Sequence, residues 1–345
     1  MNNVEYTVES VLRGHPDKLC DQISDAILDF YLLHDKNSHT AIECLGTGNK
    51  LVIAGEINSS VQLPIEEYCV KEYSKITGSS NIDIINLLSQ QSNQLIAATL
   101  NGGAGDQGIM YGYACQNQYN CLPYGYWLVN QIAKRLDNYQ KSGNSFLSDG
   151  KVQATIENDS HIKKLSINIQ HHDDTDLDQL RSTVKKDILY DIVTESIEIN
   201  PFGRFVNGGF SNDTGLTGRK IIIDTYGGML PHGGGAFSGK DPSKVDRSAA
   251  YMCRFVAKNI VSNCFAQECS VSVAYEFGQK YPVMISVVAD GIVKKDIQEF
   301  VKENFDFRPE AIIERLNLKN IKFLPTATYG HFTDPMYTWE NIINL

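Results

Sequence analysis

The sequence predicts a mixed fold of the α+β or α/β class, and two observations support that prediction. Helix and strand signals alternate along the chain of 345 residues without a low-complexity linker, and they fall into three successive mixtures. The hydrophobic fraction of 42% is enough for a substantial core, and a chain of this length is expected to hold two or three domain-sized units. The alternation alone leaves the topology of the sheets open.

Apolar residues at helical spacing predict the helices. Leu19, Ile23, Ile27 and Phe30 repeat with the helical period, and Pro16 suits the first turn of the helix that they indicate. We expect helices at residues 16–33, 66–74, 81–91, 178–197, 243–262 and 296–305. The third of these rests on apolar residues at positions 82, 85 and 88, which would share one helical face.

Compact or alternating apolar runs predict the strands. Leu165, Ile167 and Ile169 alternate with other residues, which is the pattern of a half-buried strand. We expect strands at residues 51–57, 151–156, 164–170, 220–225, 269–277 and 283–289. Residues 92–112 interrupt this pattern with five glycines, and such a density indicates turns or a close approach of the backbone to a ligand.

The overall charge and the cysteines exclude several classes of partner. Lys+Arg 31 against Asp+Glu 41 gives a net charge of -10, so the long-range field repels nucleic acids and anionic membranes. No run of about 18 apolar residues is present, and the N-terminus lacks the pattern of a secretory signal. The eight cysteines form no Cys-x-x-Cys pair. We therefore expect reduced thiols in a cytoplasmic protein without nucleic-acid or membrane partners.

A glycine-rich segment at residues 232–247 carries the densest chemistry. Residues 234–240 match the Gly-x-x-x-x-Gly-Lys spacing of a phosphate-binding P-loop, but Asp241 follows where that motif has Ser or Thr. A P-loop also leads directly from a strand into a helix, whereas about nine residues separate Thr225 from Gly234. The segment is therefore not a P-loop.

The physical basis for anion binding remains without that motif. Successive glycines expose backbone N–H groups, and a helix that starts near residue 243 offers its positive N-terminus. Asp246, in the first turn of that helix, could hold a magnesium ion already bound by phosphates. Five cations lie within 29 residues of this acidic chain, namely Arg219, Lys220, Lys240, Lys244 and Arg247. The alternative is a solvated turn with ordinary surface lysines.

A second group of polar residues lies at the start of the first helix. His15 lies just outside the helix and Asp17 lies in its first turn. A His–Asp–Lys group at this place could bind a metal and a polyphosphate, or Asp17 could only complement the helix dipole. The aspartates that follow at four-residue spacing are expected to form a solvated face, and they are Asp21, Asp25 and Asp29.

Two further features favour structural roles. Residues 171–174 (HHDD) end a predicted strand in a polar stretch, and a surface loop is favoured there over a metal site. Phe205 could stack on a base or fill the core, and the residues alone favour the core.

The motifs resemble those of one known family. Residues 14–18 (GHPDK) and 21–26 (DQISDA) resemble the N-terminal signature of S-adenosylmethionine synthetases, and residues 103–108 (GAGDQG) resemble their second signature. Three further runs follow the family pattern nearly residue for residue, at 200–205, 215–220 and 233–250. The resemblance extends from about Val8 to Trp339.

The resemblance implies an α+β fold of three similar units around a pseudo-threefold axis, which we place at residues 1–100, 101–207 and 208–345. It also implies homodimers with active sites at the interface, often paired into tetramers. In the implied reaction the sulfur of L-methionine attacks C5′ of ATP and expels triphosphate, which is then cleaved to pyrophosphate and phosphate. The implied cofactors are Mg2+ and K+. Cations within an acidic chain fit this chemistry, because a leaving triphosphate carries about four negative charges.

The resemblance also assigns roles position by position. The catalytic residues would be His15, near the bond broken at C5′, with Lys151, Arg219 and Lys240. ATP would contact His15, Asp149, Lys151, Arg204, Phe205, Asp213, Arg219, Lys220, Ala236 and Lys240, with the Phe205 ring on adenine. Methionine would contact Glu56, Asp106, Asp213 and Lys244. The metal ligands would be Asp17 and Asp246 for magnesium and Glu43 for potassium.

Two departures from the family pattern bear on function. Arg13 stands where the family usually has an acidic residue. The lid loop at residues 92–102 is shorter by several residues, and Gln94 is the only nearby candidate for the family's methionine-binding glutamine. A shorter lid could change turnover, product inhibition or amino-acid preference. The altered lid keeps one alternative open, a paralogue that uses another thioether amino acid or mainly cleaves triphosphate. An inactive chain that stabilises a partner synthetase is disfavoured, because a scaffold has no reason to keep the full set of phosphate and metal residues, which are His15, Asp17, Lys151, Arg219, Lys220, Lys240 and Asp246.

Overall fold

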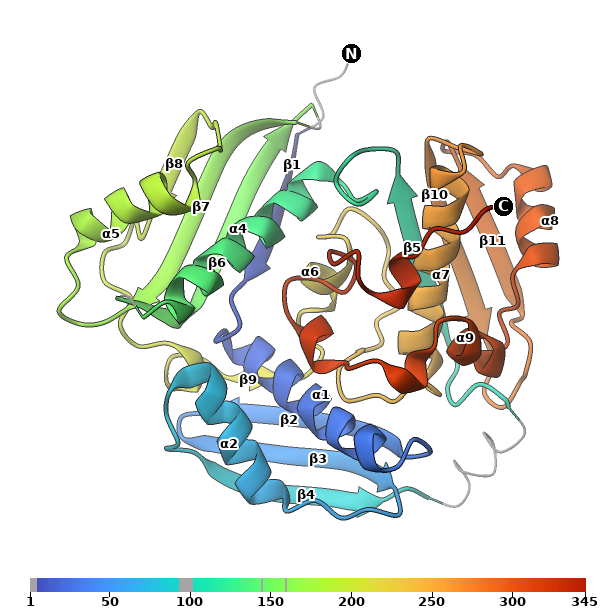
Figure 1. The fold of residues 1–345 in the computed structure, drawn as a ribbon, viewed down its shortest axis with the longest axis horizontal. Coiled ribbons are helices and arrows are strands. Elements are labelled where there is room, and N and C mark those ends of the chain that lie inside the picture. The colour runs from blue at the N-terminus through green and yellow to red at the C-terminus, as the bar shows by residue number, and fades with distance from the viewer. Residues whose placement is uncertain (1–4, 93–101, 144, 159) are drawn as a thin grey trace.

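Three small sheets, each with helices against one face, make up the molecule (Figure 1). The computed structural model describes residues 5–92, 102–143, 145–158 and 160–345. The three units are similar in build and lie around the centre of the molecule, as a pseudo-threefold α+β fold requires. The fold class predicted from the motifs is confirmed.

The first unit is built on a sheet in the order β4-β3-β2-β9. Its elements are α1 (Pro16–His34), β2 (His39–Thr47), β3 (Lys50–Asn58), α2 (Ile65–Thr77), β4 (Asp83–Gln90) and β9 (Gly215–Leu216). Leu19, Ile23 and Ile27 of α1 form one buried cluster with Ile42 and Ile53 of the sheet. The elements predicted at 16–33, 51–57 and 66–74 are confirmed.

The helix predicted at residues 81–91 is wrong, because this segment forms strand β4. It pairs in parallel with β3 along its whole length. Apolar residues three apart fit a helix, but Ile84 and Leu88 pack toward the core while Ile85 and Leu87 remain 40% and 60% exposed on the other face. The open edge of β3 decides the structure, and a tertiary partner of this kind overrides local spacing.

The second unit is built on a sheet in the order β1-β6-β7-β8. Its elements are β1 (Glu5–Val11), α4 (Tyr124–Lys141), β6 (Phe146–Glu157), β7 (His161–His171), α5 (Leu177–Thr183) and β8 (Ser196–Ile199). Leu165, Ile167 and Ile169 are fully buried, as their alternation predicts. The strands predicted at 151–156 and 164–170 are confirmed, and both are longer than expected.

The single helix predicted at residues 178–197 is only partly correct. Helix α5 gives way to a π-helical turn at Val184–Ile188, and the helix ends there. Ile197 and Ile199 then belong to β8, which pairs in parallel with β7. Isoleucines favour strands when an edge is available, and β7 supplies that edge.

The third unit is built on a sheet in the order β11-β10-β5. Its elements are β5 (Gly108–Cys115), α6 (Ile221–Thr225), α7 (Val245–Ser262), β10 (Glu268–Tyr275), β11 (Met284–Ala289), α8 (Lys295–Asn304) and α9 (Pro309–Arg315). Short 3-10 turns occupy Gly209–Ser211, Leu318–Asn320, Leu324–Ala327 and Thr338–Glu340. The elements predicted at 243–262, 269–277, 283–289 and 296–305 are confirmed.

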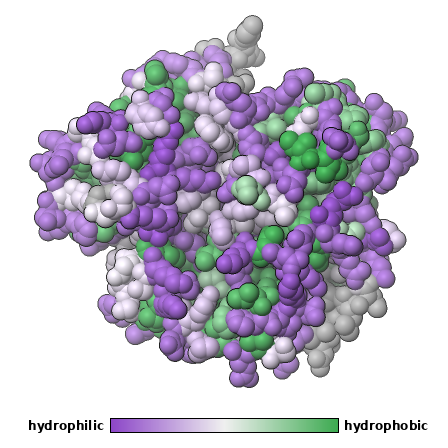
Figure 2. All heavy atoms as spheres, in the orientation of Figure 1, coloured by the Kyte–Doolittle hydropathy of each residue, from purple (hydrophilic) through white to green (hydrophobic). Residues whose placement is uncertain are grey.

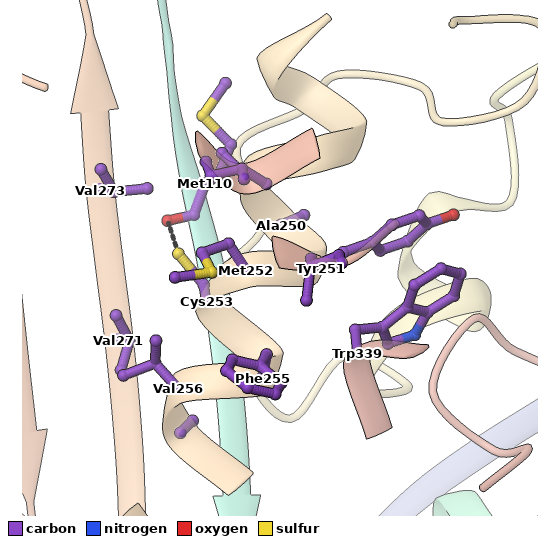
Figure 3. Packing of buried hydrophobic residues seen from close by; sticks show 14 of the residues in the cluster. Met110, Ala250, Tyr251, Met252, Cys253, Phe255, Val256, Val271, Val273 and Trp339 are labelled. Carbon is purple, nitrogen blue, oxygen red and sulfur yellow. Dashed lines mark hydrogen bonds between the residues drawn. The ribbon is translucent and has the colours of Figure 1, made fainter. Parts of the chain in front are cut away.

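Helix α7 is buried on nearly all sides (Figure 3). Cys253 and Val256 face the sheet, where Val271 and Val273 of β10 lie. On the opposite side the Tyr251 ring stacks on Trp339 of the C-terminal segment, with ring centres 3.8 Å apart. The start of α7, which carries Asp246, is therefore held rigidly.

The strand predicted at residues 220–225 is wrong, because the segment forms the short helix α6. Its run of β-branched residues favours a strand. Asp224, however, is buried and pairs with the buried Lys18 of α1. Thr225 also donates its hydroxyl hydrogen to the Ile221 carbonyl, which closes the turn. Pairing of a buried charge thus outweighs the local preference.

Each sheet takes one strand from a neighbouring segment of the chain. β1 joins the second sheet, β5 joins the third, and β9 joins the first. The boundaries at 1–100, 101–207 and 208–345 stay a prediction, and this exchange of strands ties the three units together. The face of the molecule seen in Figure 2 is mainly hydrophilic, with hydrophobic residues in separate groups. Among the described helices, none is long and apolar enough to cross a membrane.

Candidate active site

His15 and Asp17 lie where α1 begins. His15 is the N-cap, and its Nδ1 accepts a hydrogen bond of 3.2 Å from the Asp17 backbone N–H. Burial, together with the positive charge of Lys220, lowers the pKa of His15 to about 3. The imidazole is therefore neutral at pH 7, and because Nδ1 accepts, its proton lies on Nε2.

Asp17 is fully buried and forms ion pairs with two basic residues of the segment after β9. Its Oδ1 lies 2.9 Å from the Arg219 guanidinium, and its Oδ2 lies 2.5 Å from the Lys220 ammonium. The Leu216 backbone N–H also donates to Oδ1 at 2.9 Å. Burial alone would raise the pKa of Asp17, but the hydrogen bonds from Lys220 and Leu216 hold it below the usual value. A charged carboxylate thus positions two cations, and the charge of one of them, Lys220, acts on His15.

Three further predicted residues lie close to this group. Lys151 extends from β6 opposite Val11, and its charge contributes to the lowered pKa of His15. Asp149 is buried and accepts the Gly209 N–H at 2.8 Å. Burial raises the pKa of Asp149 to about 6, and the nearby charge of Asp213 also raises it. The charges of Lys151 and Asp213 both act on Asp149, and the charge of Lys151 also acts on His15. These three residues therefore lie near His15.

Arg204 and Phe205 lie on the connection that follows β8. The Arg204 guanidinium is exposed and contacts Asp173 at 2.6 Å. Phe205 is half-buried, and its backbone N–H donates to Nε2 of His171 at 3.0 Å. The prediction of a surface loop at 171–174 is wrong for His171, which is fully buried and anchors this connection.

The glycine-rich segment places Lys240 against the start of α7. The Lys240 ammonium lies 2.6 Å from the Asp246 carboxylate. A Cβ atom on Gly235 would overlap that same carboxylate, and a Cβ atom on Gly233 would overlap the carbonyl oxygen of Ile109. The adjacent glycines are therefore required by close approach of the backbone to Asp246 and β5.

Two of the five cations in the basic cluster are engaged in buried ion pairs. Lys244 pairs with Asp241, which is buried and whose pKa is held far below its usual value by Lys244 and His39 despite the opposing effect of burial. Arg247 is fully buried and binds Asp25 through both terminal nitrogens. Arg219, Lys220 and Lys240 are the cations of this cluster that retain exposed area beside a site carboxylate.

The segment that carries Arg219 and Lys220 beside Asp17 (the Asp17 group) touches the segment that carries Lys240 beside Asp246 (the Asp246 group). A Cβ atom on Gly218 would overlap the Cβ of Ala236, so the segments that carry Lys220 and Lys240 touch at this point. Within the described residues, no hydrogen bond or ion pair joins the Asp17 group to the Asp246 group.

Glu56 and Glu43, predicted to bind methionine and potassium, lie on the first sheet, and Asp106, also predicted to bind methionine, lies on the loop before β5. Glu56 of β3 stands opposite Ala41 of β2, and Ala41 forms an isolated bridge with Lys240. Glu43, two residues beyond Ala41, is exposed on the same face. Asp106 is exposed two residues before Gly108, where a Cβ atom would lie 3.6 Å from Oδ1 of Asp246.

The aspartates after Asp17 on α1 are not the solvated face that was predicted. Asp21 and Asp25 are fully buried, and Asp29 is partly buried. Buried carboxylates persist only where partners satisfy them, and each of the three accepts backbone N–H groups from another segment. A signal was available in the sequence, because residues four apart share a helical face and Asp17, four residues before Asp21, is a predicted magnesium ligand.

The described residues contain no group of three or more His, Cys, Asp or Glu side chains that could hold a metal ion. Asp17 and Asp246 instead stand singly beside cations. This arrangement fits magnesium, which is usually held by one or two carboxylates together with the phosphates of its substrate. The donor set therefore suits a metal that arrives with a nucleotide.

Of the two departures from the family pattern, the structure describes the surroundings of Arg13 but not most of the lid. Arg13 lies 2.6 Å from the buried Asp137 and donates to Gln140 at 2.6 Å, so it fastens the start of α1 to α4. Most of the short lid, including Gln94, lies outside the described residues.

In a fold of three α+β units, Asp17 holds two cations near a neutral histidine and Asp246 holds a third, an arrangement that suits a metal-dependent enzyme acting on a polyphosphate substrate. Matches to three domains of one family cover most of the chain: S-adenosylmethionine synthetase, N-terminal domain, at residues 3–93, central domain at 101–205 and C-terminal domain at 207–341. The chain is 42% identical to the S-adenosylmethionine synthase of Borreliella afzelii (strain PKo) over 375 aligned positions, covering 99% of this chain and 95% of that relative. It is also 42% identical over 374 positions, with the same coverage, to the enzyme of that name from Borrelia garinii subsp. bavariensis. The chain belongs to the S-adenosylmethionine synthetase family.

Proposed function

We propose that this chain synthesises S-adenosylmethionine from ATP and L-methionine. The sulfur attacks C5′ of ATP, a C–S bond forms as the C5′–O5′ bond breaks, and triphosphate leaves with the bonding electron pair. Water then cleaves the triphosphate to pyrophosphate and phosphate. The chain's relatives carry the name of this activity.

One observation supports this reaction above the others. Asp17 holds Arg219 and Lys220 within 2.9 Å, and Asp246 holds Lys240 at 2.6 Å, so each group presents cations whose positions are already fixed. Preorganised cations stabilise charge that develops on a leaving group without reorganising during the reaction. A triphosphate develops its charge along three phosphates, which suits cations supplied by two segments. The test is stoichiometric: each methionine consumed should yield one pyrophosphate and one phosphate, and release of phosphates without consumption of methionine would contradict the proposal.

His15 is expected to act as a neutral hydrogen-bond donor. Its Nε2–H would contact the departing O5′, because Nδ1 is occupied by the Asp17 N–H. His15→Asn should lower kcat about a hundredfold through loss of this donor. Because the pKa of His15 is lowered to about 3, the group is deprotonated at any pH well above that value. The pH–rate profile between about pH 5 and 8 should therefore contain no ionisation that His15→Asn removes. An acidic limb near neutrality that disappears in the variant would contradict this role.

Magnesium would be held by Asp17 and Asp246 together with the phosphates, and potassium by Glu43. Magnesium supplies further charge stabilisation for the triphosphate. Removal of magnesium with a chelator is expected to abolish turnover and to change Tm by less than about 2 °C, since a metal stabilises the fold only where it binds the free protein. The reason is that each carboxylate already has a lysine partner, at 2.5 and 2.6 Å. Calorimetry with and without chelator tests this, and a large fall in Tm would indicate a structural metal instead.

The remaining predicted residues supply the two substrate pockets. For ATP we propose that the half-buried Phe205 ring stacks on adenine, with Arg204, Asp149, Lys151 and Ala236 around the nucleotide. For methionine we propose contacts to its charged backbone groups from Glu56, Asp106, Asp213 and Lys244. Asp213 would lie between the two pockets, because its charge acts on Asp149.

The chain is proposed to work as a homodimer whose sites lie between the two copies. The face of the first sheet away from α1 and α2 is largely apolar, since Leu45, Val52 and Ile85 stand side by side across three strands. Leu45 and Ile85 are each 40% exposed. Exposed apolar faces of this kind mark interaction surfaces. Glu43 and Glu56 lie on the same face, so a partner on it would complete their pockets. Pairing of dimers into tetramers stays a prediction.

A cytoplasmic location is proposed from the thiols. All eight cysteines are free in the structure, and five of them are buried. Reduced cysteines are typical of a cytoplasmic protein.

A further inference from the structure

Helix α1 carries four aspartates at four-residue spacing, each in contact with a different part of the chain. Asp17 holds the Leu216 N–H, Asp21 the Gly218 N–H, Asp25 the Gly239 N–H, and Asp29 the N–H groups of Phe323 and Leu324. The donors at 216–218 and at 239 belong to the two segments that bear the site cations. We infer that Asp21 and Asp25 are positioning residues, which fix the two cationic segments at set places along one rigid helix.

Asp21 controls the segment that bears Arg219 and Lys220. Its Oδ1 accepts the Gly218 N–H at 2.8 Å, immediately before those cations. Gly218 has a φ of 78°, a left-handed conformation that glycine adopts without strain. Together, Asp17 and Asp21 hold alternate N–H groups of one short stretch, so its cations have little freedom to move relative to His15.

Asp25 controls the segment that bears Lys240. Its Oδ1 accepts the Gly239 N–H at 2.8 Å, and its two oxygens bind the Arg247 guanidinium at 2.7 and 2.8 Å. Arg247 in turn donates to the Lys240 carbonyl at 3.1 Å. The backbone on both sides of the Lys240 amide is therefore fastened, directly or through Arg247, to one buried carboxylate.

The helix fixes the place of each cationic segment within its own chain. Residues four apart on an α-helix are displaced by about 6 Å along its axis, so Asp17, Asp21 and Asp25 form a row about 12 Å long. Replacing a buried ion pair by apolar residues is often neutral for stability, so fold stability alone does not account for buried carboxylates such as Asp25. The need to place cations correctly accounts for these carboxylates, because small displacements of groups at a reacting centre lower the rate by large factors.

Asp29 provides a control within the same helix. Its two oxygens accept the N–H groups of Phe323 and Leu324 at 2.7 and 2.9 Å. It therefore makes more backbone hydrogen bonds than Asp21, but to a segment that carries no residue assigned to substrate. If the four aspartates of α1 served only to stabilise the fold, replacing Asp29 should lower activity at least as much as replacing Asp21.

The inference rests on the proposed function, so the test measures S-adenosylmethionine formation and triphosphate hydrolysis together. Asp21→Ala removes the acceptor of the Gly218 N–H, while Lys18 keeps its second partner Asp224, so no buried cation is left unpaired. We expect Asp21→Ala to lower kcat in both assays by at least about tenfold, with KM for methionine changed less than about twofold. Asp21→Asn retains an oxygen that can accept the Gly218 N–H and should restore kcat to within about threefold.

Asp29→Ala is measured beside these variants, together with the Tm of each. We expect it to keep kcat within about twofold of the parent chain, whatever its loss of Tm. Three outcomes would overturn the inference while the proposed function stands. They are an equal loss of kcat in Asp29→Ala and Asp21→Ala, full activity in Asp21→Ala, and a kcat of Asp21→Asn that stays as low as that of Asp21→Ala. A parent chain that forms no product would overturn the proposed function, and with it this inference.

Discussion

Replacing Lys240 with alanine is expected to lower kcat for S-adenosylmethionine formation by about a thousandfold. Lys240 carries its ammonium 2.6 Å from Asp246 and reaches the site from a segment that Asp25 and Arg247 hold in place. The triphosphate would lose a preorganised cation as its charge develops, and the Asp246 carboxylate would lose its counterion. The binding of methionine should change little, so the effect falls on kcat. Steady-state kinetics with both substrates varied measure it.

Lys141→Ala is the matched control for that variant. Lys141 also forms a lysine–aspartate pair of 2.6 Å, with Asp137 on α4, but it lies outside the proposed site. Loss of an ion pair as such would affect both variants equally, whereas loss of a phosphate contact affects only Lys240→Ala. Equal activities of the two variants would contradict the role of Lys240.

Mixing two inactive variants is expected to restore activity. Lys220→Ala disables the group at the start of α1, and Lys240→Ala disables the glycine-rich group. If each site takes one group from each copy, a mixed dimer has one site with both substitutions and one intact site. Random exchange of subunits makes about half of the dimers mixed, so about a quarter of the parent activity should return.

The control is a mixture of two variants within one group, such as Arg219→Ala and Lys220→Ala. Both cations contact Asp17 of their own chain, so no mixed dimer of this pair contains an intact site. Recovery in the first mixture and none in the second would establish sites shared between copies. No recovery in either mixture, with subunit exchange verified, would place both groups of a site in one chain.

The sequence predicted most long elements because their signals are local. Helices α1 and α7 and strands β7, β10 and β11 all have clear periodicity and turn residues at their ends. The failures at β4 and α6 share a cause, since each is decided by a distant partner: the edge of β3 for one and the buried Lys18 for the other. Local spacing carries no information about such partners. The exchange of β1, β5 and β9 between units is invisible for the same reason.

The candidate site was predicted residue by residue from motifs, and the structure adds its geometry. The motifs placed His15, Asp17 and Lys240 in one pocket, but they gave no reason for the neutral state of His15, which depends on burial and on Lys220. They also left Asp21 and Asp25 as surface residues. A helix that is buried on almost every side has no solvated face, and only packing reveals that α1 is such a helix.

The most direct measurement is mass spectrometry of the products that the purified chain forms from ATP and methionine with magnesium and potassium, beside Lys240→Ala. We expect S-adenosylmethionine together with pyrophosphate and phosphate from the parent chain, and none of the three above background from the variant. Pyrophosphate or phosphate without the sulfonium product, or a sulfonium formed only from another thioether amino acid, would contradict synthesis of S-adenosylmethionine as the function of this chain.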